Sequence, residues 1–469
     1  MAKSPLPQGH SLEKWRKRNL YYYHYLERFY VTLVQPQKDV LEIGSGLGYL
    51  LKAVNPATGL GVEIDAAQAA YARQRFPELD FRADDGETCD FSRKFDYILL
   101  ENTVNYLDNI EKLFNNLESA CKPSTRLILT FHNPLWNGVL KLATKIRQRR
   151  PVPSLNWLSL PDVENLLYLV GFEVIKKGKT LLFPKSLPGL SRLINRFLAP
   201  LPLLNKLCLI HYVIARKRLR EATPQRHPQP RTCSVIVPAR NEAENIEACV
   251  QRMPRLGSAT EIIFVEGHST DGTWEEIQRV AAVYGKAYDI KICQQSGVGK
   301  GDAVRQGFDM ASGDILMILD ADLTVRPEDL VYFYEAVTSG VCEFANGCRL
   351  IYPVSPKAMP WLNKMANRFF AAVISYLLNT KIKDSLCGTK ALSRENYRKI
   401  AANRAYFGDF DPFGDFDLLF GAAKLNLKMN DIPVRYLPRS YGSSNIHHFK
   451  EGLVLLRMCW HAARKLKFV

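Results

Sequence analysis

Two aspartates separated by a single residue carry the clearest chemical signal in this chain. Asp320 and Asp322 follow an apolar run at residues 315–319, so both carboxylates can reach one cation beyond the end of a strand. Mg²⁺ or Mn²⁺ bound by one or two carboxylates usually completes its coordination shell with phosphate oxygens and water. The pair therefore predicts a divalent metal site that serves a substrate with a phosphate-bearing leaving group.

Four further residues stand where predicted strands end or predicted helices begin: Pro238, Glu242, Glu266 and Lys300. The strands are expected at residues 234–237 and 261–265, and the lysine opens a helix within a Gly-Lys-Gly run. The carboxyl ends of the strands in an open α/β sheet form the edge at which nucleotides bind. We therefore expect a nucleotide site at the edge that carries Asp320 and Asp322.

The order of these motifs resembles family 2 inverting glycosyltransferases of the GT-A fold, over residues 232 to about 445. The resemblance implies a set of residues for the nucleotide sugar and a set for the metal ion on its diphosphate. These are Pro238, Glu242, Glu266 and Lys300 for the nucleotide sugar, and Asp320 and Asp322 for the metal ion. One motif departs from the family, because residues 266–268 read Glu-Gly-His where Asp-Asp-Gly is common. The identity of the nucleobase in the donor is therefore open.

Within that family the likeness is to dolichol-phosphate mannose synthases and related polyprenyl-phosphate sugar transferases. The stretches that carry it are residues 299–305, 387–394 and 432–444. The resemblance implies that Arg439 contacts a phosphate of the donor or of the acceptor. The lysine often found after the Gly-x-Ser of the last stretch is Asn445 here, so one phosphate contact is either missing or supplied by Lys390 or Arg435.

The identity of the acceptor decides whether the reaction needs a catalytic base. A lipid phosphate is already anionic at neutral pH and needs none, whereas a sugar hydroxyl needs a carboxylate to accept its proton. The acidic segment at residues 408–417 lies where family members that act on hydroxyls place such a base, and Asp415 or Asp417 would fill that role. Polyprenyl phosphate is the predicted acceptor, with a glycan hydroxyl as the open alternative.

A separate pattern of glycines and acids occurs near the N-terminus. Its glycines are Gly44, Gly46 and Gly48. They follow a strand predicted at residues 39–43, which carries Glu42, and the next predicted strand ends at Glu63. Such glycines let the backbone turn sharply and approach a ligand, and an acid at the second strand end can accept hydrogen bonds from ribose hydroxyls. The Gly-x-Gly-x-Gly spacing differs from the Gly-x-Gly-x-x-Gly of dinucleotide-binding folds.

This pattern resembles class I S-adenosylmethionine-dependent methyltransferases, over about residues 20–215. The resemblance implies cofactor contacts from the glycine loop and from three acids: Glu42 before the loop, Glu63 at the ribose and Asp84 toward the adenine. Residues 101–105 would line the pocket of the methyl acceptor, and His132 is a candidate general base for an oxygen acceptor. A non-catalytic docking module is the alternative for this half of the chain.

Two alternations of strands and helices are needed to position these motifs. The first runs over residues 35–130 and the second starts at Cys233, which predicts an α/β protein with two sheets. By resemblance, these are an N-terminal Rossmann-like methyltransferase domain and a C-terminal GT-A domain. The Arg-, Pro- and Gln-rich stretch between them keeps no hydrophobic periodicity. The predicted domains are residues 1–216 and 232–469, joined by a linker at residues 217–231.

The net charge of +16 predicts anionic partners. Basic patches suit an anionic membrane surface, phosphorylated substrates or nucleic acid, and no nucleic-acid recognition motif accompanies them here. Basic amphipathic segments at residues 359–382 and 447–467 can lie in a membrane interface. Core packing is the alternative, more so for the first segment than for the second. The longest apolar stretch, residues 369–378, is shorter than the about 20 residues that cross a bilayer.

The cysteines and the N-terminus indicate the cell compartment. None of the ten cysteines forms a Cys-x-x-Cys pair, which predicts reduced thiols. The first thirty residues contain charges and tyrosines instead of the apolar core of a signal peptide. The sequence therefore predicts a cytoplasmic enzyme that lies peripherally at the inner face of the cell membrane.

Overall fold

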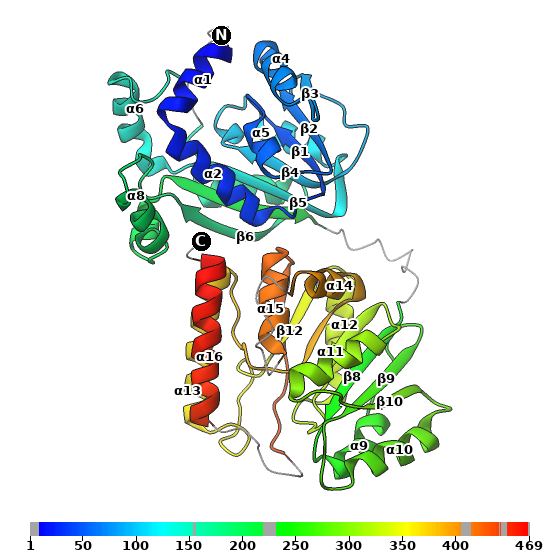
Figure 1. The fold of residues 1–469 in the computed structure, drawn as a ribbon. Coiled ribbons are helices and arrows are strands. Elements are labelled where there is room, and N and C mark those ends of the chain that lie inside the picture. Colours follow the sequence, from blue (N-terminus) through cyan, green and yellow to red (C-terminus); the bar gives the residue numbers. More distant parts are fainter. Residues whose placement is uncertain are drawn as a thin grey trace. The chain divides into compact units, whose positions relative to one another are not determined.

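The computed structural model describes residues 9–152, 156–218, 231–404, 414–439, 441 and 448–467. These residues form two compact units that divide after Arg218, and each unit is built around its own seven-stranded sheet (Figure 1). The predicted α/β fold is confirmed. Residues 219–230 of the predicted linker lie outside the described residues.

The sheet of the N-terminal unit has the strand order β3-β2-β1-β4-β5-β7-β6. Its strands are β1 (Asp39–Ile43), β2 (Thr58–Glu63), β3 (Asp80–Ala83), β4 (Phe95–Glu101), β5 (Cys121–His132), β6 (Phe172–Thr180) and β7 (Ile210–Lys217). Strands β1 to β5 are parallel, and β7 runs antiparallel between β5 and β6. The chain order reverses between β1 and β4, which is where a doubly wound sheet opens a crevice for ligands.

Helices cover the N-terminal sheet. They are α1 (Gly9–Arg18), α2 (Leu20–Leu33), α3 (Tyr49–Ala53), α4 (Ala66–Arg75), α5 (Ile110–Leu117), α6 (Asn137–Lys145), α7 (Leu160–Leu169) and α8 (Leu190–Leu193), with the shorter turns η1 (Thr103–Asn105), η2 (Pro134–Trp136), η3 (Ile194–Leu198) and η4 (Leu204–Leu207). Alternate residues of β1 face different buried clusters, because Leu41 and Ile43 belong to one and Val40 to another. A parallel strand that is buried on both faces is usually apolar, and in β1 only Asp39 and Glu42 depart from this.

The sheet of the C-terminal unit has the order β10-β9-β8-β11-β13-β12-β14. Its strands are β8 (Cys233–Ala239), β9 (Thr260–Glu266), β10 (Asp289–Gln294), β11 (Ile315–Ile318), β12 (Phe344–Cys348), β13 (Lys390–Ser393) and β14 (Met429–Pro433). Strands β10, β9, β8 and β11 are parallel, and β13 runs antiparallel to both β11 and β12. The chain order reverses between β8 and β11, so Pro238 and Asp320 follow or end neighbouring strands.

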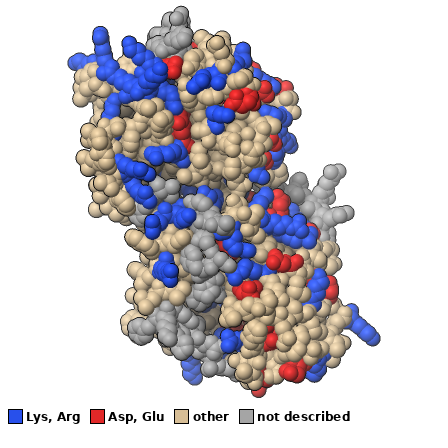
Figure 2. All heavy atoms as spheres, in the orientation of Figure 1, with Lys and Arg blue, Asp and Glu red and all other residues tan. Residues whose placement is uncertain are grey.

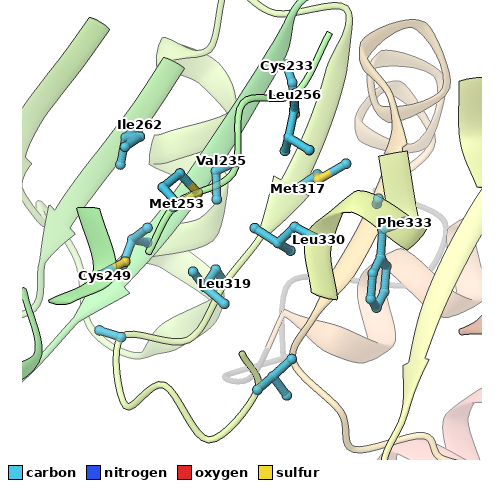
Figure 3. Packing of buried hydrophobic residues seen from close by; sticks show 14 of the residues in the cluster. Cys233, Val235, Cys249, Met253, Leu256, Ile262, Met317, Leu319, Leu330 and Phe333 are labelled. Carbon is cyan, nitrogen blue, oxygen red and sulfur yellow. The ribbon is translucent and has the colours of Figure 1, made fainter. Parts of the chain in front are cut away.

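Helices of the C-terminal unit pack against its sheet. They are α9 (Ala243–Gln251), α10 (Thr273–Tyr284), α11 (Lys300–Met310), α12 (Leu330–Thr338), α13 (Trp361–Leu378), α14 (Arg394–Ala402), α15 (Asp415–Lys424) and α16 (His448–Ala462), with the turns η5 (Pro327–Asp329) and η7 (Ala463–Lys467). Val235 of β8 and Met317 of β11 share a hydrophobic core with Leu330 and Phe333 of α12 (Figure 3). Among the helices of the described residues, none combines the length and apolar character needed to cross a bilayer.

Candidate active sites

The glycine loop of the N-terminal unit joins β1 to α3 at the crevice of the sheet. Gly44, Gly46 and Gly48 all have positive φ, a conformation that side chains rarely adopt. A Cβ atom on Gly44 would collide with Thr103, and one on Gly48 would collide with Phe81. A Cβ atom on Gly46 would meet only a side-chain oxygen at 3.7 Å. The loop is therefore packed at its two ends and open in its middle.

Glu63, at the end of β2, lies directly against this loop. Its Oε2 accepts a hydrogen bond from the Gly46 N–H at 2.8 Å, and its Oε1 accepts one from the Asp65 N–H at 3.0 Å. Burial raises the pKa of the Glu63 carboxyl, and these two N–H groups oppose that shift. The Asp84 N–H donates to the Glu63 carbonyl at 3.1 Å, so Asp84 lies at the same edge, one strand further along. The structure thus brings the predicted cofactor residues together.

Two buried polar atoms beside the loop lack partners among the described residues. They are Oε2 of Glu42 and Oγ of Ser45. Burial, followed by the charge of Glu101, raises the pKa of the Glu42 carboxyl well above its ordinary value. A buried oxygen without a hydrogen bond costs free energy. Two such oxygens beside an open loop fit a ligand that carries hydroxyl or ammonium donors.

Glu101 occupies the end of β4, next to the glycine loop. The hydroxyl of Thr103 donates to the Ile43 carbonyl at 2.8 Å, which ties the segment after Glu101 to the end of β1. Burial, followed by the charge of Glu27, raises the pKa of the Glu101 carboxyl to about 7, although Arg16 opposes the shift. The resemblance implies an acceptor pocket at residues 101–105 but does not distinguish this acid from its neighbours. The available signal was an acid directly after the apolar run of β4.

His132 ends β5 and is fully surrounded by protein. Its Nδ1 lies 3.2 Å from Oδ1 of Asn105. Burial, with the charge of Arg149, lowers the pKa of the imidazole to about 3. The ring is therefore neutral at physiological pH, and so weak a base gives little help in removing a proton from an acceptor. Glu101 is better matched to that task.

The first of the two aspartates in the C-terminal unit pairs with a lysine. Nζ of Lys300, at the start of α11, lies 2.5 Å from Oδ1 of Asp320, directly after β11. Burial disfavours the ionised Asp320, but Lys300, aided by Arg349 and Lys390, outweighs it and lowers the pKa of the carboxyl. The carboxylate therefore stays charged and poised for a cation.

The second aspartate belongs to a cluster around Arg439. Nη2 of Arg439 lies 2.7 Å from Oδ2 of Asp322, and Nη1 lies 3.4 Å from Oε1 of Glu242. The N–H and the hydroxyl of Thr324 both donate to Oδ1 of Asp322, at 3.1 and 2.8 Å. Burial, together with the charge of Asp322, raises the pKa of the Glu242 carboxyl. Residues almost 200 positions apart in sequence thus meet at one sheet edge.

Glu266 and Pro238 lie at the adjoining strand ends. Pro238 pairs with Val265 in the β8–β9 register, and the next pair is Ala239 with Glu266. The buried Glu266 carboxylate accepts a hydrogen bond from the Ser269 N–H at 2.5 Å. This hydrogen bond holds the carboxylate in the turn that follows β9.

Gly388 and Lys390 are supporting residues whose packing the sequence could not show. A side chain on Gly388 would collide with Nζ of Lys300 and with the Asp320 carboxylate. The fully buried Lys390 donates from Nζ to the Cys387 carbonyl at 2.5 Å. The Cys-Gly-Thr-Lys stretch therefore forms the wall behind the Lys300–Asp320 pair.

The acidic segment that was predicted to hold a base is only partly described. Residues 405–413 and the side chain of Asp415 lie outside the described residues, as do Ser440 and residues 442–447. Asp417, on α15, forms an ion pair with Arg404, in which Nε lies 2.8 Å from Oδ2. Its carboxylate is thus engaged by a guanidinium.

Comparison with known families assigns each unit. Residues 234–401 match the model of glycosyl transferase family 2, and residues 15–177 match the model of a methyltransferase domain. The predictions of a glycosyltransferase and of a methyltransferase are confirmed at this level.

Several characterised relatives are similar to this chain. Glycosyltransferase AglJ of Haloferax volcanii is 27% identical over 239 residues, which are 50% of this chain and 74% of AglJ. Dolichol-phosphate mannosyltransferase of Pyrococcus furiosus is 31% identical over 176 residues, which are 36% of this chain and 48% of that enzyme. Polyprenol monophosphomannose synthase of Mycolicibacterium smegmatis is 27% identical over 225 residues, which are 47% of this chain and 82% of that enzyme. This chain therefore joins a methyltransferase domain at residues 15–177 to a family 2 glycosyltransferase domain at residues 234–401.

Proposed function

We propose that this chain is a bifunctional enzyme. Its C-terminal unit transfers a sugar, with inversion, from a nucleotide sugar to polyprenyl phosphate, as part of cell-surface glycan or glycolipid synthesis. Its N-terminal unit transfers a methyl group from S-adenosylmethionine. The observation that carries the sugar transfer is the cluster of Lys300, Asp320, Asp322, Arg439 and Glu242 at one sheet edge.

The two aspartates fit Mg²⁺ or Mn²⁺, because they offer hard oxygen donors from positions separated by one residue. The remaining coordination sites would be filled by phosphate oxygens and water. Bound there, the ion would neutralise charge on the departing nucleoside diphosphate. In the structure, Lys300 and Arg439 neutralise these carboxylates. Beside a bound ion, Lys300 and Arg439 would hold phosphate oxygens of the donor and the acceptor.

The remaining predicted residues would orient the donor. Glu266 and Glu242 would accept hydrogen bonds from the nucleoside, and Pro238 would form the apolar floor between them. Both carboxyls are buried, which favours their use as hydrogen-bond acceptors for a specific ligand over exposure to water. Holding the donor in one orientation supplies much of the rate enhancement of a group transfer.

A phosphate acceptor is supported by the engagement of Asp417. Its carboxylate is paired with Arg404, and such a pair stabilises the charged form that a base needs but hinders its approach to an acceptor. A lipid phosphate needs no base, since its oxygen is already anionic. Two relatives are named for dolichol-phosphate and polyprenol-phosphate mannose transfer, which supports the same class of acceptor.

The N-terminal unit fits S-adenosylmethionine. The open face of Gly46 and the unpaired oxygens of Glu42 and Ser45 form a cradle for a ligand with hydroxyl and ammonium donors. Glu63 would take the ribose and Asp84 would approach the adenine. The cofactor supplies the activated methyl group, so the protein mainly aligns the acceptor, and Glu101 would accept the proton that the acceptor loses.

A peripheral position at the inner face of the cell membrane is part of this proposal. Helices α13 and α16 lie side by side and expose Trp361, Phe369, Leu453 and Trp460 (Figure 1). Basic side chains accompany them, including Lys364, Arg368 and Arg457. Such helices can lie in a membrane interface, where the phosphate of a polyprenyl lipid is located. The charge needs no nucleic-acid partner.

Sugar transfer is best tested with the full chain, a panel of nucleotide sugars, and polyprenyl phosphate or simple glycans as acceptors, with products detected by mass spectrometry. We expect a glycosylated lipid phosphate, formed only with Mg²⁺ or Mn²⁺. Asp322→Asn should lower the rate by about a hundredfold or more, because a metal ligand is lost. Asp309→Asn, at an exposed site on α11, is the matched control. Full activity of Asp322→Asn would overturn the metal site, and glycan products alone would overturn the acceptor.

A further inference from the structure

Large apolar side chains are exposed on two segments of the N-terminal unit. Residues 135–146, from η2 and α6, expose four of them, and residues 187–207, from α8, η3 and η4, expose eight. The exposed fraction is 58% for Leu142 and 78% for Leu203. Monomeric proteins rarely leave a large contiguous apolar patch open to water, so such a concentration marks a contact with an apolar partner.

The two segments form one face. At one end, Nε1 of Trp136 donates to the Leu207 carbonyl at 2.8 Å. At the other end, Nζ of Lys185 lies 3.2 Å from Oε1 of Gln148. Figure 1 shows α6 and α8 on the same side of the N-terminal unit. We call residues 135–149 and 185–207 together the apolar–basic surface.

In the segment formed by α8 and η3, polar side chains are buried and apolar side chains are exposed, which is the reverse of an ordinary surface helix. The side chains of Ser191 and Asn195 are buried, and they donate to the carbonyls of Lys185 and Phe183 at 2.6 and 2.7 Å. Leu193 and Phe197 are about half exposed, at 56% and 49%. A helix beside water normally buries its apolar face and exposes its polar one. Here the polar side is satisfied by the protein, and the apolar side is presented outward.

The charge of the N-terminal unit is concentrated around this surface. Residues 1–128 contain 16 Lys and Arg against 17 Asp and Glu, whereas residues 129–218 contain 15 against 3, a net charge of +12. Residues 174–218 contain no acidic residue. In Figure 2, blue Lys and Arg side chains stand among neutral residues on this side of the unit. Basic residues near an anionic membrane are attracted to its surface and strengthen binding.

We propose that the apolar–basic surface docks the N-terminal unit on an anionic lipid bilayer. The leucines and phenylalanine would enter the boundary between headgroups and acyl chains, while Arg192, Arg196 and Lys206 would reach the lipid phosphates. The proposal goes beyond the two transfer reactions and requires neither of them.

Charge argues against the other occupants of this surface. A second copy would bring two strongly basic faces together. Residues 219–469, with 32 basic and 27 acidic residues, carry a net charge of +5, so as a whole they do not attract a basic face. A nucleic acid would neutralise the arginines but would leave the exposed leucines in water. An anionic bilayer satisfies both kinds of side chain.

The test is co-sedimentation of the full chain with vesicles of phosphatidylcholine alone or mixed with phosphatidylglycerol. We expect binding to the mixed vesicles, and a loss of at least about tenfold for the double variant Leu142→Glu and Leu193→Glu, because two apolar contacts are removed and two like charges face the lipid. The double variant Val283→Glu and Val341→Glu adds the same charge at exposed apolar sites of the C-terminal unit and should bind as the parent does. Unchanged binding of the first variant, or an equal loss in both, would overturn the proposal.

A second measurement guards against a variant that simply misfolds. Leu203→Cys, labelled with a polarity-sensitive fluorophore, should show a blue shift with mixed vesicles, and Val283→Cys should not. Analytical ultracentrifugation without vesicles covers the remaining outcomes. If the parent chain is a dimer and the double variant Leu142→Glu and Leu193→Glu is a monomer, the surface binds a second copy. That result would overturn the proposal of membrane docking. Because these vesicles contain no polyprenyl phosphate, nucleotide sugar or S-adenosylmethionine, the outcome is independent of the proposed reactions.

Discussion

At the scale of single residues, both units place carboxylates where burial and neighbouring charges set their ionisation. Lys300 lowers the pKa of Asp320 and keeps its carboxylate charged, whereas burial and the charge of Glu27 raise the pKa of Glu101 to about 7. The first suits a metal ligand, and the second suits a group that takes up a proton. The same side-chain chemistry thus serves different tasks because its surroundings differ.

Glu101 makes the stability of the N-terminal unit depend on pH. Its pKa is about 7 in the folded state against an ordinary value of 4.5, so above pH 7 the folded state bears the cost of a buried charge that the unfolded state avoids. That cost disappears as the pH falls from 7 to 4.5. At pH 8 the free energy of unfolding of Glu101→Gln should therefore exceed that of the parent by about 1–3 kcal/mol. This difference should disappear near pH 4.5.

Thermal or denaturant unfolding of both proteins across this pH range measures the difference. Glu111→Gln, at an exposed site on α5, is the control and should follow the parent at every pH. A difference that persists at pH 4.5, or none at pH 8, would contradict the assigned ionisation of Glu101.

At the scale of elements, the loop between β1 and α3 separates residues needed for folding from residues that face a ligand. Gly44 and Gly48 are packed against Thr103 and Phe81, and Gly46 is open. All three have positive φ, so a side chain at any of them bears a similar backbone strain of about 1–2 kcal/mol. The difference between the positions therefore lies in what surrounds them.

Gly46→Ala and Gly48→Ala form a matched pair. Because the strain is shared, Gly46→Ala should lose only about 1–2 kcal/mol of stability and yet weaken S-adenosylmethionine binding markedly, since its methyl group points into the open cradle. Gly48→Ala should lose several kcal/mol more through the collision with Phe81. Unfolding experiments and calorimetric titration separate the two effects. Equal stability of the variants, or undiminished cofactor affinity of Gly46→Ala, would contradict this account of the loop.

At the scale of the whole molecule, the chain consists of two units, each with its own sheet and its own core. Along the chain, β7 is the last strand of the N-terminal sheet and β8 is the first strand of the C-terminal sheet. The glycine loop with Glu63 and the cluster of Asp322 with Arg439 are each built from residues of one unit. Each site can therefore be lost without dismantling the other.

Asp322→Asn and Gly46→Ala test this separation in the full chain. Asp322→Asn should lower the rate of sugar transfer by about a hundredfold or more. It should leave S-adenosylmethionine affinity within about twofold of the parent, a difference below about 0.5 kcal/mol. Gly46→Ala should do the reverse. A variant that reduces both activities while remaining folded would show that the two sites are energetically coupled.

The fold class and most strands could be predicted from the sequence. Apolar runs such as those of β1, β8 and β11 are buried on both faces, so their composition alone indicates a parallel strand. Short or half-exposed strands such as β10 and β12 do not stand out in the sequence in this way, and β3 is expected only from the resemblance, as the strand before Asp84. β3 and β10 lie at the outer ends of the parallel strands, and β12 and β13 pair only after long connections. Their sequences carry weak periodicity, because pairing partners distant in the chain determine them.

Local order in the sequence determined which residues could meet at a sheet edge: the glycine loop with Glu63, and the polar residues that follow β8, β9 and β11. Tertiary structure alone decided that Arg439 bridges Asp322 and Glu242, that Gly388 backs Lys300, and that Arg404 engages Asp417. It also decided that α8 and η3 present leucines outward. Strand ends follow from periodicity and turn chemistry, which are local. Ion pairs and exposed faces depend on packing between distant segments, which no local pattern encodes.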